Sequence, residues 1–492
     1  MSMSSYSAMS TEFQADAGTP LRPELADLGR LGRRAVRQVV RTARSDDTPP
    51  VARLLLEHLG PVGGTAAVAG ESWPAYEHVN VQLGLEAWLS QPGRSHRLVG
   101  LTNFRHREFG LADLLSVTAR DPWGTRPGNV ATVTLATGPG GASRSCVECA
   151  IYLVDDGERR LALLLRGPDE GGGHQGVSLQ VVADDGTGAD VGAQVRDLAL
   201  EHNVFRSQVV GFGGDMFGER HSLLTFHRRP DLTRDDVVLP EAVLDIVERQ
   251  VVGVGRQRAR LLASGQHLKR GLLLYGPPGT GKTHTIRYLL SRLTGTTVVL
   301  LSGNALHLVA QACSIARSLQ PSMVVIEDVD LIAEERGMHP GQNPMLFQLL
   351  NEMDGLAEDT DVVFVLTTNR ADLLEPALAA RPGRVDQAVE LVLPDAEARR
   401  ALLHLYRGRL DLDLTGADHV IDRTEGVTAS FLKELLRRAA VVAAEADGPR
   451  EPDGEAAPIA VRAEHLSAAL DELLATRNAM TRALLGNTEP TR

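Results

Sequence analysis

The octapeptide 276-GPPGTGKT-283 combines glycines, a lysine and a threonine at a spacing that suits the binding of phosphate groups. It follows the apolar run 271–275 and opens the segment 283–293, which has the character of a helix. A glycine loop between a strand and a helix is the context that a P-loop requires. The backbone of such glycines turns several N–H groups toward one point, where they and the positive end of the helix hold phosphates. The glycines are Gly276, Gly279 and Gly281.

Two side chains of the octapeptide complete the predicted nucleotide site. Lys282 is expected to reach the β- and γ-phosphates, and Thr283 is expected to ligate Mg²⁺. Lysine stands out at position 282, because arginine supplies almost all of the 51 basic residues. We therefore predict that ATP and Mg²⁺ bind here, with contacts from Gly276, Pro277, Pro278, Gly279, Thr280, Gly281, Lys282 and Thr283.

In the segment 323-MVVIEDVD-330, two adjacent carboxylates, Glu327 and Asp328, follow an apolar run. A strand that ends in acids downstream of a P-loop is a Walker B arrangement, in which one acid holds the water shell of Mg²⁺ and its neighbour orients and deprotonates the attacking water. By position, Glu327 serves the metal and Asp328 is the base. The order Glu-Asp inverts the Asp-Glu of most such ATPases, and Asp is one methylene shorter than Glu. A displacement near 1 Å costs about 100-fold in rate, so either acid remains a candidate for the base.

A polar amide and two arginines follow farther along the chain. The segment 363-VFVLTTN-369 places Asn369 at the end of another apolar strand, where its amide can bond the γ-phosphate or the attacking water. The turn 381-RPGRVD-386 brings Arg381 and Arg384 close together. An arginine aimed at a γ-phosphate accelerates transfer by about 1,000- to 100,000-fold. A turn at this location does not easily reach the nucleotide of its own subunit, so these arginines are expected to act on a neighbour, which implies a ring.

Alternating strands and helices must position these groups, which predicts an α/β P-loop domain with a mostly parallel sheet over residues 241–394. Its strands are expected to be near-continuously apolar, since helices cover both faces. From residue 395 to 485 the pattern is helical and predicts a lid domain, followed by a tail at 486–492. The expected strands of the α/β domain are 271–276, 296–302, 322–328, 362–368 and 387–394.

The N-terminal half has a different pattern. Residues 50–228 alternate glycine-rich breaks with strand-like runs, and Asp155-Asp156-Gly157 between two such runs is a hairpin signal. We predict an α+β N-terminal domain that binds a partner, joined to the ATPase by a polar linker at 229–240. Residues 1–20 are expected to be a disordered tail, and residues 21–48, which are rich in arginine, a basic amphipathic helix.

Composition limits the class of protein. The formal net charge is -12 over 492 residues, which disfavours non-specific nucleic-acid binding, because such binding depends on cationic contacts to phosphate. No run approaches the roughly 18 apolar residues of a membrane span. Three cysteines and no secretion signal indicate a reducing compartment, so we expect a cytoplasmic protein. The pair Cys146 and Cys149 is interpreted as two small apolar strand residues rather than half of a zinc site, which normally needs four ligands.

Residues from about 240 to 480 resemble the AAA ATPase module, which belongs to the AAA+ superfamily. The resemblance rests on the P-loop, the Walker B acids, 349-LLNEMDG-355, the asparagine and RPGRVD, and it covers about half of the chain. The Glu-Asp order and the lead-in 268-LKRGLLLYG-276 are most similar to a branch that includes the mitochondrial chaperone of respiratory-complex assembly and related bacterial proteins. The resemblance implies a homo-oligomeric ring, expected to be a hexamer, with Asn369 as sensor and Arg381 and Arg384 as arginine fingers. Because the turn is one residue longer than usual, either arginine remains a candidate for the finger.

Two absences narrow this resemblance. Unfolding rings of this kind usually carry an aromatic residue and a glycine in a loop after the second strand, but the segment 303-GNALHLVAQACSIARSLQP-321 has no aromatic residue. Threading of a polypeptide by the usual grip is therefore in doubt. No HExxH motif occurs in these residues, so we expect no zinc protease within them.

The leading hypothesis is a ring-forming AAA ATPase with a chaperone role that remodels or repositions a protein partner. One alternative is a scaffold or switch that is controlled by nucleotide and hydrolyses ATP slowly, which the missing aromatic and the short Asp328 favour. A DNA-processing motor is a further alternative, and only the basic helix at 21–48 supports it.

Overall fold

The computed structural model describes residues 48–60, 67–105, 107–116, 124–169, 174–184, 188–212, 224–330, 344–372, 385–447 and 458–475. The predicted tails, nearly all of the predicted basic helix, and both Arg381 and Arg384 lie outside these residues. Within the described part, no helix combines the length and the apolar character needed to cross a bilayer.

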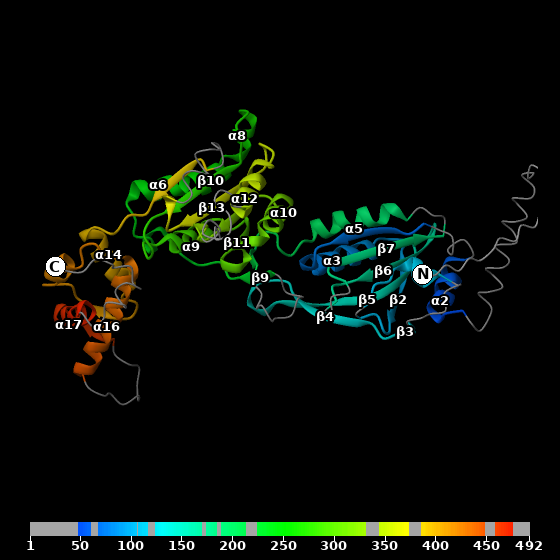
Figure 1. Ribbon diagram of the computed structural model, residues 1–492, viewed down its shortest axis with the longest axis horizontal. Coiled ribbons are helices and arrows are strands. Elements are labelled where there is room, and N and C mark those ends of the chain that lie inside the picture. Colours follow the sequence, from blue (N-terminus) through cyan, green and yellow to red (C-terminus); the bar gives the residue numbers. More distant parts are fainter. Residues whose placement is uncertain are drawn as a thin grey trace, which may run out of the picture.

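The main α/β unit of the chain is built around a central sheet (Figure 1). Within the described residues its strand order is β14-β10-β13-β12-β11-β8-β9. All neighbouring pairs from β14 to β8 are parallel, and only β8 and β9 pair antiparallel. The strands are β8 (Val209–Phe212), β9 (Leu224–His227), β10 (Arg270–Tyr275), β11 (Thr297–Leu301), β12 (Ser322–Ile326), β13 (Val362–Thr368) and β14 (Gln387–Glu390).

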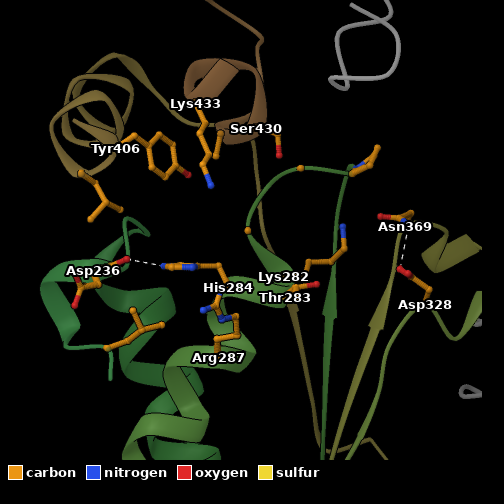
Figure 2. Close-up of a pocket in the computed structure, with 16 residues that line it drawn as sticks. Asp236, Lys282, Thr283, His284, Arg287, Asp328, Asn369, Tyr406, Ser430 and Lys433 are labelled. Carbon is orange, nitrogen blue, oxygen red and sulfur yellow. Dashed lines mark hydrogen bonds between the residues drawn. The ribbon is translucent and has the colours of Figure 1, made fainter. Parts of the chain in front are cut away.

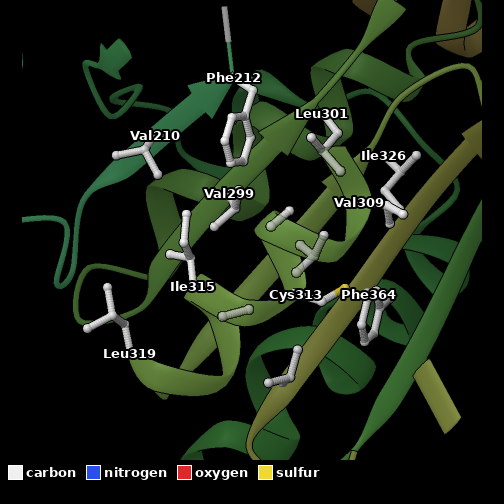
Figure 3. Packing of buried hydrophobic residues seen from close by; sticks show 14 of the residues in the cluster. Val210, Phe212, Val299, Leu301, Val309, Cys313, Ile315, Leu319, Ile326 and Phe364 are labelled. Carbon is white, nitrogen blue, oxygen red and sulfur yellow. The ribbon is translucent and has the colours of Figure 1, made fainter. Parts of the chain in front are cut away.

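Helices cover both faces of this sheet, which explains why its strands lack polar alternation. On one face, every second residue of a strand, such as Val299 of β11 and Ile326 of β12, packs against α10, as Figure 3 shows. On the other face, their neighbours such as Val298 and Val325 pack against Ile286 of α9. The helices around the sheet are α6 (Glu241–Glu248), α7 (Val254–Arg256), α8 (Arg258–Ala263), α9 (Lys282–Arg292), α10 (Val309–Ser318) and α12 (Pro344–Asp354).

A second, antiparallel sheet forms the N-terminal unit. Its main path is β1-β7-β6-β5-β2-β3, and β4 also pairs with β5. Side chains of β5 and β6 alternate between two cores, so that Tyr152 and Leu163 face α3 and α5 while Ile151 and Leu164 face α2 and α4. The elements are α2 (Pro50–Leu59), β1 (Ala69–Trp73), α3 (His78–Leu89), β2 (Ser95–Leu101), α4 (Leu111–Leu115), β3 (Pro127–Gly128), β4 (Ala131–Ala136), β5 (Ser143–Asp155), β6 (Arg160–Arg166), β7 (Val177–Ala183) and α5 (Ala189–Glu201).

The two cysteines of the CxxC pair are buried residues of β5. They belong to different apolar clusters, Cys146 to the one that includes α10 and Cys149 to the one that includes α2. Burial raises the pKa of the Cys146 thiol to about 11 and that of Cys149 to about 12. Protonated, buried thiols of this kind act as small apolar side chains.

The boundary between the two units differs from the predicted one. The sequence places residues 207–228 in the N-terminal domain, but β8 pairs in parallel with β11 and β9 closes a hairpin against β8, so both strands belong to the central sheet. The physical reason is the edge of β11, whose backbone groups need a partner strand. The predicted linker 229–240 also packs against the α/β unit, because Arg229 donates hydrogen bonds to the carbonyls of Leu290, Ser207 and Thr296.

A joint of apolar and polar contacts connects the N-terminal unit to this hairpin. The ring of Tyr76 meets the ring of Phe212 edge-on, with centroids 6.0 Å apart. Beside it, Asn80 and Asn203 both donate to Oε2 of Glu77, at 2.7 and 3.4 Å. Burial raises the pKa of the Glu77 carboxyl, and these two bonds lower it by less. The joint therefore contains an acid whose charge is disfavoured.

A helical unit follows the central sheet, as the sequence pattern predicts from residue 395 onward. Within its described residues it has its own apolar core, which includes Leu403, Phe431 and Leu470. Asp395 caps its first helix by accepting from the N–H of Ala398 at 2.8 Å. Its elements are α14 (Ala396–Tyr406), β15 (Asp411–Leu412), α15 (Asp418–Arg423), α16 (Ala429–Asp447), β16 (Ala460–Val461) and α17 (Ala463–Leu474).

Candidate nucleotide site

The glycine loop lies between β10 and α9, and its backbone conformation depends on glycine. Gly276, Gly279 and Gly281 have φ of +143°, +80° and +106°, which residues with a Cβ rarely adopt. At Gly276 a Cβ would also come within 2.4 Å of the Leu391 carbonyl oxygen. At Gly281 it would meet nothing within 4 Å, so the loop opens there into a cavity. This is a cradle of the kind that the binding of phosphates requires.

Lys282 is the first residue of α9, and its ammonium group is held at the mouth of this loop. Its Nζ donates to the carbonyls of Gly276 and Pro277, at 2.7 and 2.8 Å. The side chain is 7% exposed. Burial lowers its pKa, while the carboxylates of Asp328 and Asp330 oppose that shift. An ammonium group has three N–H donors, so Lys282 can bind an anion in the loop as well.

The predicted acids and the predicted asparagine come together at the neighbouring strand ends. Glu327 and Asp328 follow β12, and Asn369 follows β13, which lies between β12 and β10 in the sheet. Carboxyl ends of parallel strands meet at one edge, where α/β proteins bind ligands. Nδ2 of Asn369 lies 3.4 Å from Oδ1 of Asp328 and donates to it (Figure 2).

The two acids have different surroundings. Asp328 is exposed and lines the cavity, with its backbone at φ +50° and its N–H bonded to Oγ1 of Thr367 at 3.0 Å. Glu327 is half-buried, and its Oε1 is shielded from solvent without a hydrogen-bond partner among the described residues. An unsatisfied buried carboxylate oxygen needs an explanation, and the water shell of a bound Mg²⁺ would supply one.

Asp330 fixes the strand end that carries Asn369. It is 7% exposed, and its Oδ1 accepts from Oγ1 of Thr368 at 2.9 Å and from the N–H of Asn369 at 3.3 Å. The carboxylate therefore ties the end of β13 to the loop after β12, and it keeps the asparagine facing the loop of Lys282.

A cavity of about 660 Å³ joins these groups. Lys282, Thr283, Asp328 and Asn369 line it together with Pro278, Gly279 and Gly281. Part of its wall comes from residues that the sequence does not single out. His284 and Arg287 follow the loop on α9, and the others are distant along the chain: Leu232, Asp236, Leu405, Tyr406, Ala429, Ser430 and Lys433. The sequence does contain a signal for Lys433. Like Lys282, it is one of only three lysines in a chain whose other basic residues are arginines.

The helical unit closes one side of this cavity. A Cβ at Gly279 would lie 3.0 Å from Oγ of Ser430, so the glycine loop and the start of α16 are in contact. Lys433 follows on the same helix, with its Nζ 5.8 Å from the centre of the Tyr406 ring, and Figure 2 shows it pointing into the cavity. An adjoining cavity of about 550 Å³ shares Gly281, His284 and Tyr406, and apolar residues such as Val237 and Leu393 line it.

The comparison with known protein families identifies the unit that carries this site. Residues 272–393 match the family described as "ATPase family associated with various cellular activities (AAA)". The chain carries an AAA ATPase domain. ATP is the nucleotide of this domain, Mg²⁺ is its usual metal, and ATP hydrolysis is its reaction. The glycine cradle, the buried ammonium of Lys282 and the unsatisfied Oε1 of Glu327 fit these two ligands.

Curated relatives of the AAA chain include ATP-dependent zinc metalloproteases. This chain is 37% identical to FtsH 2 of Sphaerobacter thermophilus over 225 residues. The matched region covers 43% of this chain and 34% of that protein. This chain is 32% identical over 303 residues to FtsH 3 of the same organism, with 58% of each chain covered. This chain is 32% identical to FtsH of Mycobacterium bovis over 257 residues, which make up 49% of this chain and 33% of that protein. The AAA chain therefore spans between one third and three fifths of the length of these relatives.

Two findings bear on metals and on Arg381 and Arg384. Among the side chains that the structure describes, no three His, Cys, Asp or Glu residues gather into a group that could hold a metal ion. Arg381 and Arg384 lie outside the described residues, so their roles stay predictions.

Proposed function

We propose that this AAA protein is a ring-forming ATPase that hydrolyses ATP at subunit boundaries to remodel or reposition a protein partner. The observation that carries the proposal is the single cavity at the carboxyl edge of the sheet, lined by Lys282, Thr283, Asp328 and Asn369. A phosphate-binding loop, a carboxylate and a sensing amide in one place are the groups that phosphoryl transfer to water requires.

Each residue has a role in this proposal. Lys282 and the loop amides bind the phosphates, while Thr283 and Glu327 would hold Mg²⁺, which would neutralise charge on the phosphates. Asp328 accepts the proton of the attacking water, because it is exposed in the cavity, whereas Glu327 is not part of its wall. Asn369 orients the same water through its contact with Asp328.

The neighbouring helical unit acts as a lid on the nucleotide. Tyr406, Ser430 and Lys433 line the cavity from α14 and α16, so that a change in the nucleotide alters the contacts between the lid and the glycine loop. The adjoining apolar cavity has the size and character to receive the base.

A protein partner is supported by two observations. The relatives are named as ATP-dependent proteases, which act on proteins. The N-terminal unit of this chain contacts the hairpin of the ATPase sheet, because the ring of Tyr76 meets that of Phe212. The proposal also includes a hexameric ring, in which Arg381 and Arg384 serve a neighbouring subunit, and a cytoplasmic location.

A nucleotide-controlled scaffold with slow hydrolysis is a second candidate. It is favoured by the segment after β11, where residues Gly303–Leu308 form a short 3₁₀ helix without an aromatic side chain. Such a segment has no bulky ring with which to grip an extended polypeptide. The two candidates differ in whether a protein partner accelerates turnover.

The test uses the Asp328→Asn chain, which is expected to bind ATP and to stay assembled without turnover. Proteins that it retains in cells are identified, purified and added to the wild-type chain, and ATP turnover is measured against subunit concentration. Turnover that rises with self-association and again with a retained protein is the expected result. Asp359→Asn, an exposed aspartate, is the matched control and should retain nothing more than wild type. A chain that remains monomeric with ATP at every concentration at which it turns ATP over would exclude the ring. A slow rate that no retained protein changes would favour the scaffold.

A further inference from the structure

A separate cavity lies at the edge of the central sheet opposite the nucleotide site. Its volume is about 380 Å³. Its wall includes Arg270 and Ser322, where β10 and β12 begin, and Asp361, which directly precedes β13. Because these parallel strands carry the nucleotide site at their carboxyl ends, this cavity at their amino ends cannot share a ligand with it.

Positive charge is concentrated around this cavity. Four arginines and one aspartate line it, which gives a formal charge of +3 (four positive charges less one negative), although the whole chain has a formal charge of -12. The arginines are Arg256, Arg258, Arg270 and Arg292.

The single acid is already engaged. Asp361 is buried, and its Oδ1 accepts from Nη1 of Arg270 at 2.9 Å. Arg258 lies farther from it, with Nε 3.9 Å from Oδ2. Arg270 also donates to the carbonyls of Gln250, Leu268 and Val251, which fixes its guanidinium in the wall. The buried pair thus anchors the site and does not neutralise the other arginines.

Arg256 and Arg292 are exposed and have no acidic partner among the residues that the structure describes. Each occupies the last turn of a helix, α7 or α9, where a cation offsets the partial negative charge of the terminal carbonyls. That preference explains a basic residue at each position separately. It does not explain why both side chains border the same cavity as Arg258 and Arg270.

The loop after α9 keeps the cavity open. A Cβ at Gly295 would meet no heavy atom within 4 Å, and the flanking Thr294 and Thr296 line the wall with it. The same loop contacts the segment that leads into β8, because Oγ of Ser207 donates to the carbonyl of Gly295 at 3.2 Å. A ligand in this cavity would therefore touch the loop that holds this segment.

We propose that this cavity binds a small anion that carries two or more phosphate groups. Guanidinium groups match phosphate oxygens through two parallel hydrogen bonds, and a surplus of three positive charges favours a ligand with several negative charges over a single carboxylate. The volume suits a ligand of about the size of pyrophosphate or a nucleotide. The proposal is independent of the ATPase function, because it concerns the opposite edge of the sheet.

The test is a calorimetric titration of inorganic pyrophosphate into the full-length Lys282→Ala chain, so that the glycine loop contributes least, at about 0.15 M salt. One binding site per chain is expected. In the same background, Arg256→Gln combined with Arg292→Gln should raise the Kd at least about tenfold, because charge-assisted contacts to phosphate are lost. The single variants Arg256→Lys and Arg292→Lys keep the charge but lose the paired geometry, so their Kd values should lie between the two.

Controls separate a site from a general effect of charge. Arg400→Gln removes a half-buried arginine of α14 that pairs with Asp418, and it should leave the Kd unchanged. Citrate, which presents carboxylates, should bind at least about tenfold more weakly than pyrophosphate. Thermal denaturation establishes that each variant is folded, and the lysine variants decide the question if the double variant is not.

Several outcomes would overturn the proposal. They are absence of pyrophosphate binding to the Lys282→Ala chain, an affinity that the arginine variants leave unchanged, an equal loss in Arg400→Gln, and an equal affinity for citrate. The readout is the difference between arginine variants in one background, so it holds whether or not Lys282 proves to bind ATP.

Discussion

At the scale of single residues, the site places a buried ammonium group beside the glycine loop. The ammonium of Lys282 is buried, and burial lowers its pKa. Two carbonyls accept hydrogen bonds from it, but carbonyl dipoles replace only part of the water that a charge loses on burial. Phosphate oxygens in the glycine loop would supply the rest.

Lys282→Ala is therefore expected to raise the Kd for ATP at least about 100-fold, since hydrogen bonds to charged phosphates are lost. Equilibrium binding of a fluorescent ATP analogue measures this change. Lys269→Ala is the matched control, because Lys269 directly precedes β10 and does not line the cavity. An ATP affinity that survives Lys282→Ala would contradict the assignment of the loop.

Asp328 has a strained backbone at the position proposed for the base. Its φ of +50° lies in the left-handed region, which Asp enters at a cost and which is common at functional sites. This conformation turns the carboxylate of Asp328 toward the amide of Asn369 and into the cavity.

The two acids should respond differently to removal of their charge. Asp328→Asn is expected to lower kcat by about 100- to 10,000-fold with ATP binding retained, because a general base is lost. Glu327→Gln should instead raise the Mg²⁺ concentration for half-maximal turnover by about 10- to 100-fold. Steady-state kinetics across a Mg²⁺ series separates the effects, and the reverse pattern would move the base to Glu327.

At the scale of elements, the sequence predicts individual strands, helices and loops, but it does not predict contacts between elements that are distant along the chain. The glycine loop and the strands on both sides of it follow from short patterns, since β10, β12 and β13 are apolar runs with helices on both faces. The strand β8 has the same composition as a strand of either sheet, so no pattern in residues 207–212 could assign it to β11. Lys433 reaches the site only because α16 folds back over the glycine loop, and a contact across some 150 residues leaves no periodic signal.

Lys433 provides a test of the proposed lid. Lys433→Met keeps the length of the side chain but removes its charge, and it should raise the KM for ATP at least about tenfold if the ammonium contacts the nucleotide. Arg437→Met on the same helix is the control, because Arg437 is exposed and pairs with Glu434. Equal KM values for Lys433→Met and wild type would remove α16 from the nucleotide site.

The joint beside Glu77 predicts a dependence of stability on pH. Burial raises the pKa of this carboxyl above its ordinary value of 4.5, so the folded state holds the proton more tightly than the unfolded state. The resulting stability is full below pH 4.5 and is lost as the pH rises through the folded-state pKa, by at most about 1.4 kcal/mol per pH unit.

Glu77→Gln removes this titration and keeps an oxygen that accepts from Asn80 and Asn203. Relative to wild type, the variant should gain stability on going from pH 4 to pH 8, measured by urea denaturation at several pH values. Glu57→Gln, at an exposed position of α2, controls for the loss of a negative charge. Parallel pH profiles for Glu77→Gln and wild type would show that Glu77 ionises freely in the joint.

At the scale of the whole molecule, the proposed ring makes the active site a shared property. If Arg384 serves a neighbouring subunit, Arg384→Ala chains keep an intact glycine loop, and Lys282→Ala chains keep an intact arginine. Neither variant by itself should turn over ATP at the wild-type rate, and Arg384→Ala should lower the rate by about 1,000- to 100,000-fold. Mixed in equal amounts, they should regain measurable ATP turnover.

The mixing ratio and the second arginine complete that experiment. Recovery should be greatest near equal amounts, and Arg381→Ala is tested in the same way to decide which arginine acts. Arg400→Ala, with its arginine on the helical unit, should be active before any mixing. Absence of recovery at all ratios for both arginines would argue against an active site shared between subunits.

The hairpin of β8 and β9 has a consequence for how such chains can be recombined. Cutting the chain at residue 228, the boundary that the sequence indicates, would strip both strands from β11 and leave the edge that contains Val299 and Leu301 uncovered. An uncovered apolar edge pairs with strands of other molecules and leads to aggregation. A transplanted ATPase unit of this protein must therefore begin before Ser207 and carry the hairpin with it. The natural seam for exchanging partner-binding modules lies inside the N-terminal half, in the turn between α5 and β8.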